Sequence, residues 1–61
     1  MIVATLDNLR IEWDGRRFWF RGMANGDQGA SEDEVLSAIL KHDYEPTADG
    51  LAVLGWQRPG P

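Results

Sequence analysis

The residue types that could carry out catalysis are few in this chain. His42 is the only histidine, Ser31 and Ser37 are the only serines, and there is no cysteine. A catalytic triad needs a nucleophile, a histidine that takes its proton and a third group that orients the histidine. The local pattern assigns Ser31 to a helix cap instead. We therefore expect a protein that is not an enzyme, with His42 in the last turn of a helix.

Ligands for a metal ion or a cofactor are equally sparse. Without cysteine the chain has no thiolate ligand. A calcium loop counted from Asn25 fails, because Ala30 stands where such a loop needs glycine and Leu36 where it needs a bidentate carboxylate. The glycines before Ser31 lead into acidic residues, which would repel a phosphate. We expect no metal and no cofactor.

The charged residues are distributed unevenly. Residues 1–24 hold four arginines against three acids, whereas residues 25–50 hold one lysine against seven acids, and the formal net charge is −4. Duplex nucleic acid binds mainly through neutralisation of its phosphates, so this balance favours a protein partner. The predicted acidic surface consists of Asp27, Glu32, Asp33, Glu34, Asp43, Glu45 and Asp49.

Alternating apolar residues predict three strands within residues 1–21. Asp7-Asn8 and Asp14-Gly15 are both typical of two-residue hairpin turns. These turns pair Leu6 with Leu9, and Ile11 with Phe18. One face of the predicted sheet is then apolar, formed by Ile2, Ala4, Leu6, Leu9, Ile11, Trp13, Phe18 and Phe20.

The rest of the chain predicts one helix and one further strand. Ser31 and Glu34 have the spacing of a capping box, which places a helix from there to about Asp43. Its buried stripe is predicted to be Val35, Leu36, Ile39 and Leu40. Residues 22–30 are expected to form a loop and residues 51–56 a strand. The expected fold is a single α+β domain over residues 1–57, in which a three-stranded antiparallel meander carries one helix on one face and a fourth, C-terminal strand (β-β-β-α-β), followed by a disordered tail at 58–61.

The parity of Trp19 places it on the sheet face opposite the helix. Arg10, Arg17 and Arg21 share that face, and the predicted register sets Glu12 opposite Arg17 and Arg10 opposite Trp19. Tryptophan and arginine are enriched among residues that dominate binding energy. The sequence therefore predicts a partner-binding site at Arg10, Arg17, Trp19 and Arg21. The alternative is that Trp19 packs beneath the last strand.

Residues 51–56 are apolar on both parities of the predicted strand. One side of such a strand would need cover from a second copy or another protein, so we expect a homodimer or a partner contact there. The residues of this association strand are Leu51, Val53, Leu54 and Trp56.

These features together predict a small acidic protein-interaction module. By size and charge it is similar to the inhibitors and regulators of host or partner proteins made by phages and mobile elements. The alternative is a nucleic-acid-binding module that uses the arginine and tryptophan face. No apolar run approaches the roughly 20 residues that span a bilayer, so we expect a cytoplasmic protein with no membrane partner.

Overall fold

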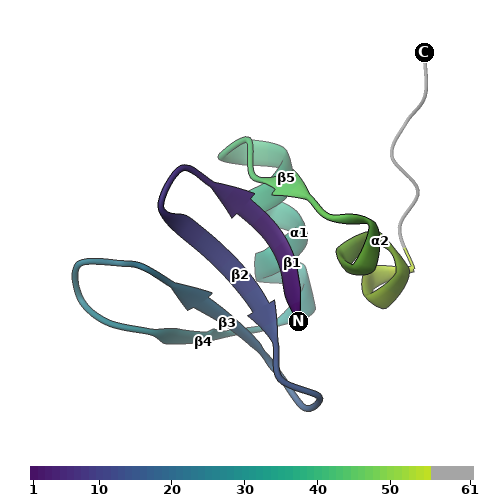
Figure 1. Ribbon diagram of the computed structural model, residues 1–61, viewed down its shortest axis with the longest axis horizontal. Helices are drawn as coiled ribbons and strands as arrows, with labels where there is room; N and C mark the ends of the chain where they lie inside the picture. Colours follow the sequence, from purple (N-terminus) through teal and green to yellow (C-terminus); the bar gives the residue numbers. More distant parts are fainter. Residues whose placement is uncertain (56–61) are drawn as a thin grey trace.

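A computed structural model describes residues 1–55 and contains one antiparallel sheet and two helices. In space the strands follow the order β4-β3-β2-β1-β5 (Figure 1). The α+β class and the meander of the first three strands are confirmed, but residues 1–55 form five strands and two helices. The elements are β1 (Ile2–Leu6), β2 (Leu9–Trp13), β3 (Phe18–Arg21), β4 (Gln28–Ala30), α1 (Glu32–Lys41), β5 (Glu45–Pro46) and α2 (Ala48–Leu54).

The first hairpin contains a bulge that the alternation did not reveal. Leu6 pairs with Leu9 as expected, but the register shifts between Ile2 and Ala4. A bulge adds one residue to a strand and so reverses the side-chain parity beyond it. Val3 is consequently buried and Ile2 is 44% exposed, so the placement of Ile2 on the apolar face is wrong.

The second hairpin has a longer loop than Asp14-Gly15 predicted. Trp13 pairs with Phe18, and Ile11 pairs with Phe20. Residues 14–17 form the loop, which the Asp14 N–H closes by donating to the Arg17 carbonyl at 3.1 Å. The predicted pairing of Ile11 with Phe18 is therefore wrong. The observed partner of Ile11 lies two residues beyond the predicted one. Because this shift in register is an even number of residues, each side chain keeps its predicted face.

The predicted loop at residues 22–30 contains a short edge strand. Gly22 ends β3 with a φ of +87°, in the left-handed region that favours glycine. The chain then returns as β4, in which Gly29 pairs with Trp19 of β3. The loop assignment is wrong for Gln28–Ala30, because hydrogen bonding to β3 outweighs the low strand propensity of glycine.

Helix α1 begins as its sequence predicts. The Ser31 hydroxyl accepts from the Glu34 backbone N–H at 3.1 Å, and a Glu34 carboxylate oxygen accepts from the Ser31 N–H at 3.0 Å. The helix ends at Lys41, and Asp43 adopts a φ of +60°. That left-handed residue turns the chain and brings Tyr44 into the core, where it is only 6% exposed.

The core lies between α1 and one face of the sheet. Val35 and Ile39 are buried as predicted, Leu36 is half-buried, and Leu40 is 65% exposed, so the placement of Leu40 in the stripe is wrong. Ala38 takes the inward position instead. The buried residues are Val3, Ala4, Ile11, Phe18, Val35, Ala38, Ile39 and Tyr44.

The C-terminal strand predicted at residues 51–56 is wrong for its described part, because residues 51–54 belong to α2. The Thr47 hydroxyl accepts from the Gly50 N–H at 2.9 Å and donates to the Ile2 carbonyl at 2.7 Å. A Cβ at Gly50 would lie 2.0 Å from the Val3 carbonyl oxygen, so the first turn of α2 rests directly on β1. Trp56 and the tail predicted at 58–61 lie outside the described residues. Within residues 1–55, neither helix combines the length and the apolar character needed to cross a membrane.

Candidate partner-binding face

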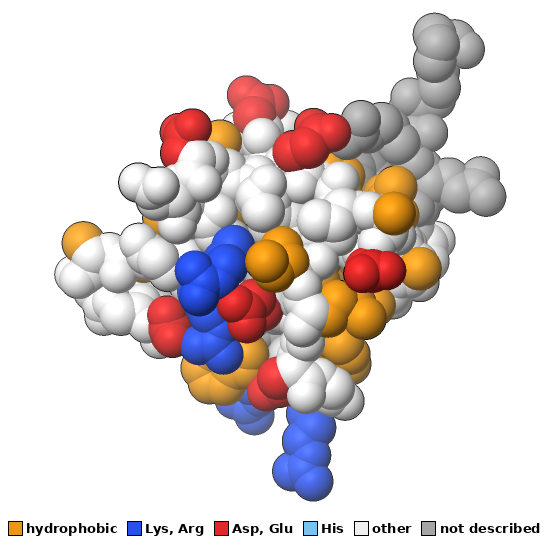
Figure 2. Space-filling model, in the orientation of Figure 1, with side chains coloured by type: hydrophobic (Ala, Val, Ile, Leu, Met, Phe, Trp, Pro, Cys, Tyr) orange, Lys and Arg blue, Asp and Glu red, His pale blue; other side chains and the backbone are white. Residues whose placement is uncertain are grey.

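We call the side of the sheet opposite α1 the outer face. It carries Arg10, Glu12, Trp19 and Arg21 on strands β2 and β3, with Arg17 in the loop directly before β3. Figure 2 shows basic and acidic side chains gathered over these strands. In the orientation that it shares with Figure 1, the sheet lies in front of α1.

Trp19 is held by contacts on several sides. The guanidinium carbons of Arg17 and Arg21 lie 5.7 and 5.6 Å from the centroid of its ring, within the range of cation–π attraction. Gly29 on the neighbouring strand has no side chain, and a Cβ there would lie 3.9 Å from the Trp19 ring. The indole N–H donates to a carboxylate oxygen of Asp14 at 2.8 Å. The ring is therefore half-buried and fixed in orientation.

Asp14 is the site residue that sequence reasoning missed. One of its carboxylate oxygens accepts from the backbone N–H groups of Arg16 and Arg17 at 2.7 and 2.8 Å, while the other accepts from Trp19. The indole hydrogen bond, followed by the two backbone hydrogen bonds, lowers the pKa of Asp14 to about 2. An aspartate at the first position of a turn is the signal that points to this arrangement, because its side chain binds amides two and three residues later.

Glu12 organises the arginines beside Trp19. Its carboxylate accepts from Arg10 Nε at 2.6 Å and from Arg21 Nε at 3.0 Å, and Arg21 also pairs with Asp27. The hydrogen bond from Arg10 is the largest of the effects that hold the pKa of Glu12 below its usual value.

The cross-strand pairs predicted for this face differ from those observed in the second hairpin. Glu12 lies opposite Trp19 and Arg10 lies opposite Arg21, because the longer loop shifts the register. The expected pairs Glu12 with Arg17 and Arg10 with Trp19 are therefore wrong. The structure does bring Arg17, Trp19 and Arg21 into contact and places Arg10 in the adjoining ion-pair network.

The loop between β2 and β3 carries the unpaired positive charge of this face. Arg16 and Arg17 form no side-chain ion pair with any residue in 1–55, whereas Arg10 and Arg21 are both paired. Both loop arginines are exposed. The outer face therefore presents two exposed arginines without salt bridges, one of which, Arg17, lies over the ordered tryptophan.

The predicted acidic surface is spread over several elements. Three of its members, Glu32, Asp33 and Glu34, occupy the first turn of α1, where the helix dipole stabilises negative charge. Asp49 has the same position in α2. Within the described chain, no three histidine, aspartate or glutamate side chains gather as metal ligands. The full set is Asp27 beside Arg21, Glu32, Asp33 and Glu34 in α1, Asp43 after α1, Glu45 in β5 and Asp49 in α2.

The residues of the predicted association strand are helical. Leu51, Val53 and Leu54 are half-buried in α2, and Val53 and Leu54 pack against the core of the same chain. They therefore cannot join a second sheet as a strand while α2 is formed. The strand contact predicted for the homodimer is therefore wrong, and the homodimer itself stays a prediction.

Comparison with protein-family models, with curated proteins and with solved structures gave no match. Function therefore has to follow from the geometry of the site. Among the residues predicted to bind a partner, Arg17 and Arg21 both contact Trp19. Trp19 is also hydrogen-bonded to Asp14. We therefore take this cluster as the candidate site.

Proposed function

We propose that this protein is a small non-enzymatic binding module whose outer face recognises an acidic surface of a partner protein. The observation that carries the proposal is the state of Trp19, which lies between two arginines and is oriented by Asp14. By covering that surface, the module would inhibit or regulate its partner.

The order of the outer face supports a role in binding. A side chain that is already fixed loses little conformational entropy when a partner arrives. Trp19 is fixed by a hydrogen bond at its indole nitrogen and by the two guanidinium groups. Tryptophan and arginine also supply much of the energy at protein interfaces.

The distribution of charge indicates the chemistry of the partner. Arg16 and Arg17 form no salt bridge within residues 1–55, although Arg17 is attracted by Asp14, so their exposed guanidinium groups can still pair with carboxylates on another protein. The acidic first turn of α1 belongs to the helix on the other side of the sheet. Complementary charge chiefly sets the rate of association and the choice of partner.

Nucleic acid is the weaker alternative for the same face. Bases bind by stacking on open aromatic rings, and here two guanidinium groups already lie over the ring of Trp19. The net charge of −4 opposes a densely charged duplex more strongly than a protein surface that carries a few carboxylates.

The proposal can be tested by selecting short random peptides on the immobilised protein and measuring the affinity of the selected sequences. We expect aspartate and glutamate to be enriched. Trp19→Ala should weaken binding by roughly 30-fold or more, which corresponds to ~2 kcal/mol. Arg17→Ala should weaken binding more than Arg16→Ala, because Arg17 alone of this pair contacts the Trp19 ring.

Two results would contradict the proposal. Selected peptides without acidic enrichment, or with equal affinity for Trp19→Ala, would show that the outer face is not the binding site. Tighter binding of a DNA duplex, with log affinity falling against log salt at a slope near −2.7 for about three phosphate contacts, would favour the nucleic-acid alternative.

A further inference from the structure

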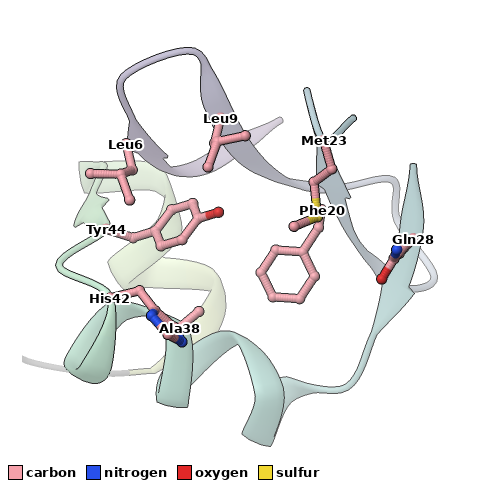
Figure 3. A pocket seen from close by; sticks show the side chains of 8 residues that line it. All are labelled: Leu6, Leu9, Phe20, Met23, Gln28, Ala38, His42 and Tyr44. Carbon is pink, nitrogen blue, oxygen red and sulfur yellow. The ribbon is translucent and has the colours of Figure 1, made fainter. Parts of the chain in front are cut away.

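A pocket of about 350 Å³ opens on the other side of the sheet, at the C-terminal end of α1 (Figure 3). Its walls come from the two residues that flank the turn of the first hairpin, from β3, β4 and the loop between them, and from the end of α1 and the segment that follows it. Most of its surface is apolar. The lining residues are Leu6, Leu9, Phe20, Met23, Gln28, Ala38, His42 and Tyr44.

Tyr44 brings one polar group into this pocket. Its side chain is 6% exposed, and Figure 3 shows its hydroxyl pointing away from the helix, towards Leu9 and the space beside Phe20. The hydroxyl forms no hydrogen bond with residues 1–55, and no buried side-chain oxygen in that range lacks a partner, so the hydroxyl oxygen is reached by water from the pocket. Burial raises the pKa of Tyr44, which keeps the hydroxyl protonated and able to donate. A donor that faces an apolar pocket and has no protein acceptor is available to a ligand that supplies one.

We propose that this pocket binds a small neutral molecule that has one aromatic ring and a carbonyl oxygen, with the oxygen accepting the Tyr44 hydrogen bond. The volume fits this class, since a cavity of about 150 Å³ holds benzene and ligand pockets begin at about 300 Å³. A ring with a short substituent would fill the space.

The walls favour an aromatic ring over an aliphatic chain. The centroids of the Phe20 and Tyr44 rings lie 6.2 Å apart and the rings are inclined at 55°, which is a direct tilted contact, so a third ring in the pocket would pack against this pair rather than between its members. Met23 is 38% exposed at the mouth, and its flexible thioether makes favourable contacts with aromatic rings.

The charges around the pocket favour a neutral ligand. No lysine or arginine lines it, so the buried part of an anion would have no fixed positive partner. His42 and Gln28 stand among the lining residues as the other polar groups. The whole protein is acidic, which disfavours anions further.

The test uses acetophenone and isopropylbenzene, which have nearly the same shape but differ in the carbonyl oxygen. In methyl-detected NMR of the intact protein, acetophenone should shift the signals of Leu6, Leu9 and Met23, and should bind about tenfold more tightly than isopropylbenzene. Tyr44→Phe should remove that advantage and leave isopropylbenzene binding unchanged. Leu40→Ala, on the exposed side of α1, should alter neither affinity.

Three outcomes would overturn the proposal. Methyl signals that do not move with either compound would show a hydrated cleft without a ligand role. Equal affinities of the wild type for the two compounds would show that the Tyr44 hydroxyl is not used, even if Tyr44→Phe failed to fold. Tighter binding of benzoate than of acetophenone would contradict the neutral ligand. Trp19→Ala should not change acetophenone binding, because Trp19 does not line the pocket. The test of the pocket is therefore independent of the function proposed for the outer face.

Discussion

The two faces of the sheet are built from different interactions. The face towards α1 contains fully buried aliphatic residues such as Val3 and Ile11, which pack against Val35 of the helix. The outer face contains arginines, acids and a tryptophan linked by hydrogen bonds and ion pairs. Burying an aliphatic side chain contributes about 1.5–3 kcal/mol, whereas an exposed ion pair contributes about 0–1 kcal/mol. One face therefore holds the fold together, and the other is free to be specialised for binding.

The largest expected effect comes from the covered face. Ile39→Ala should lower the free energy of unfolding by about 2–5 kcal/mol, because Ile39 is 6% exposed and its removal leaves a cavity. Leu40→Ala is the matched control on the next residue, and its effect should stay within about 0.5 kcal/mol because Leu40 is exposed. Thermal and urea unfolding would measure both. Equal effects of the two substitutions would contradict the observed orientation of α1.

The contact between α2 and β1 gives the second largest effect. Gly50→Ala should destabilise the protein by about 1–3 kcal/mol, because the new Cβ would meet the backbone oxygen of Val3 at 2.0 Å and force the helix away. Gly29→Ala is the control, since its Cβ would make only ordinary contacts of 3.6 Å or more. A Gly50→Ala variant that unfolds like the wild type would show that α2 does not rest on β1.

Sequence patterns predicted the elements whose signals are local. The capping box of Ser31 and Glu34 placed the start of α1, and the alternation in residues 1–21 placed three strands on the correct faces apart from the bulge. The sequence did not predict helix α2, because a helix of seven residues that includes a glycine has little intrinsic stability in isolation. Its Thr47 cap and the fit of Gly50 on Val3 depend on tertiary contact. The pairing of β4 with β3 is likewise decided by a partner distant in sequence.

The alternation of side chains along a strand was enough to predict which residues of the candidate site share one face of the sheet. Parity placed Trp19 with Arg17 and Arg21 on the outer face, and the structure brings the three together. Parity could not give the loop length, so the roles of Asp14 and the partners of Glu12 were missed. The pocket at Tyr44 depends on a left-handed turn at Asp43, which no local pattern specifies.

A smaller effect on stability is expected from the outer face. Trp19→Ala should cost about 1 kcal/mol, because the ring is only half-buried and the core behind the sheet stays intact. The loss of binding under the proposed function should be larger than this loss of stability. Calorimetry of the variant would measure its unfolding. A Trp19→Ala variant as unstable as Ile39→Ala would show that Trp19 belongs to the core, and the contrast between the two faces would fail.

The smallest effect is the dependence of the outer face on pH through Asp14. The pKa of Asp14 is about 2 in the folded protein against an ordinary value of 3.8, so its hydrogen bonds favour the folded state fully above about pH 4. This contribution should be lost as the pH falls from about 4 towards 2, when the folded carboxylate takes up its proton. NMR can follow the Asp14 carboxyl carbon and the Trp19 indole N–H over that range.

Substitution of the tryptophan separates the causes of this shift. Trp19→Phe removes the indole hydrogen bond, the largest of them, while the backbone N–H groups of Arg16 and Arg17 still donate to Asp14. The pKa of Asp14 should then rise towards its ordinary value without reaching it. The indole N–H of Trp13, which forms no hydrogen bond with Asp14, is the internal control and should not follow the titration. An Asp14 that titrates near 3.8 in the wild type, with an unchanged Trp19 signal, would mean that the aspartate does not orient the ring. Trp19 would then have to be ordered by its partner on binding, and the outer face would lose the rigidity that distinguishes it from an ordinary charged surface.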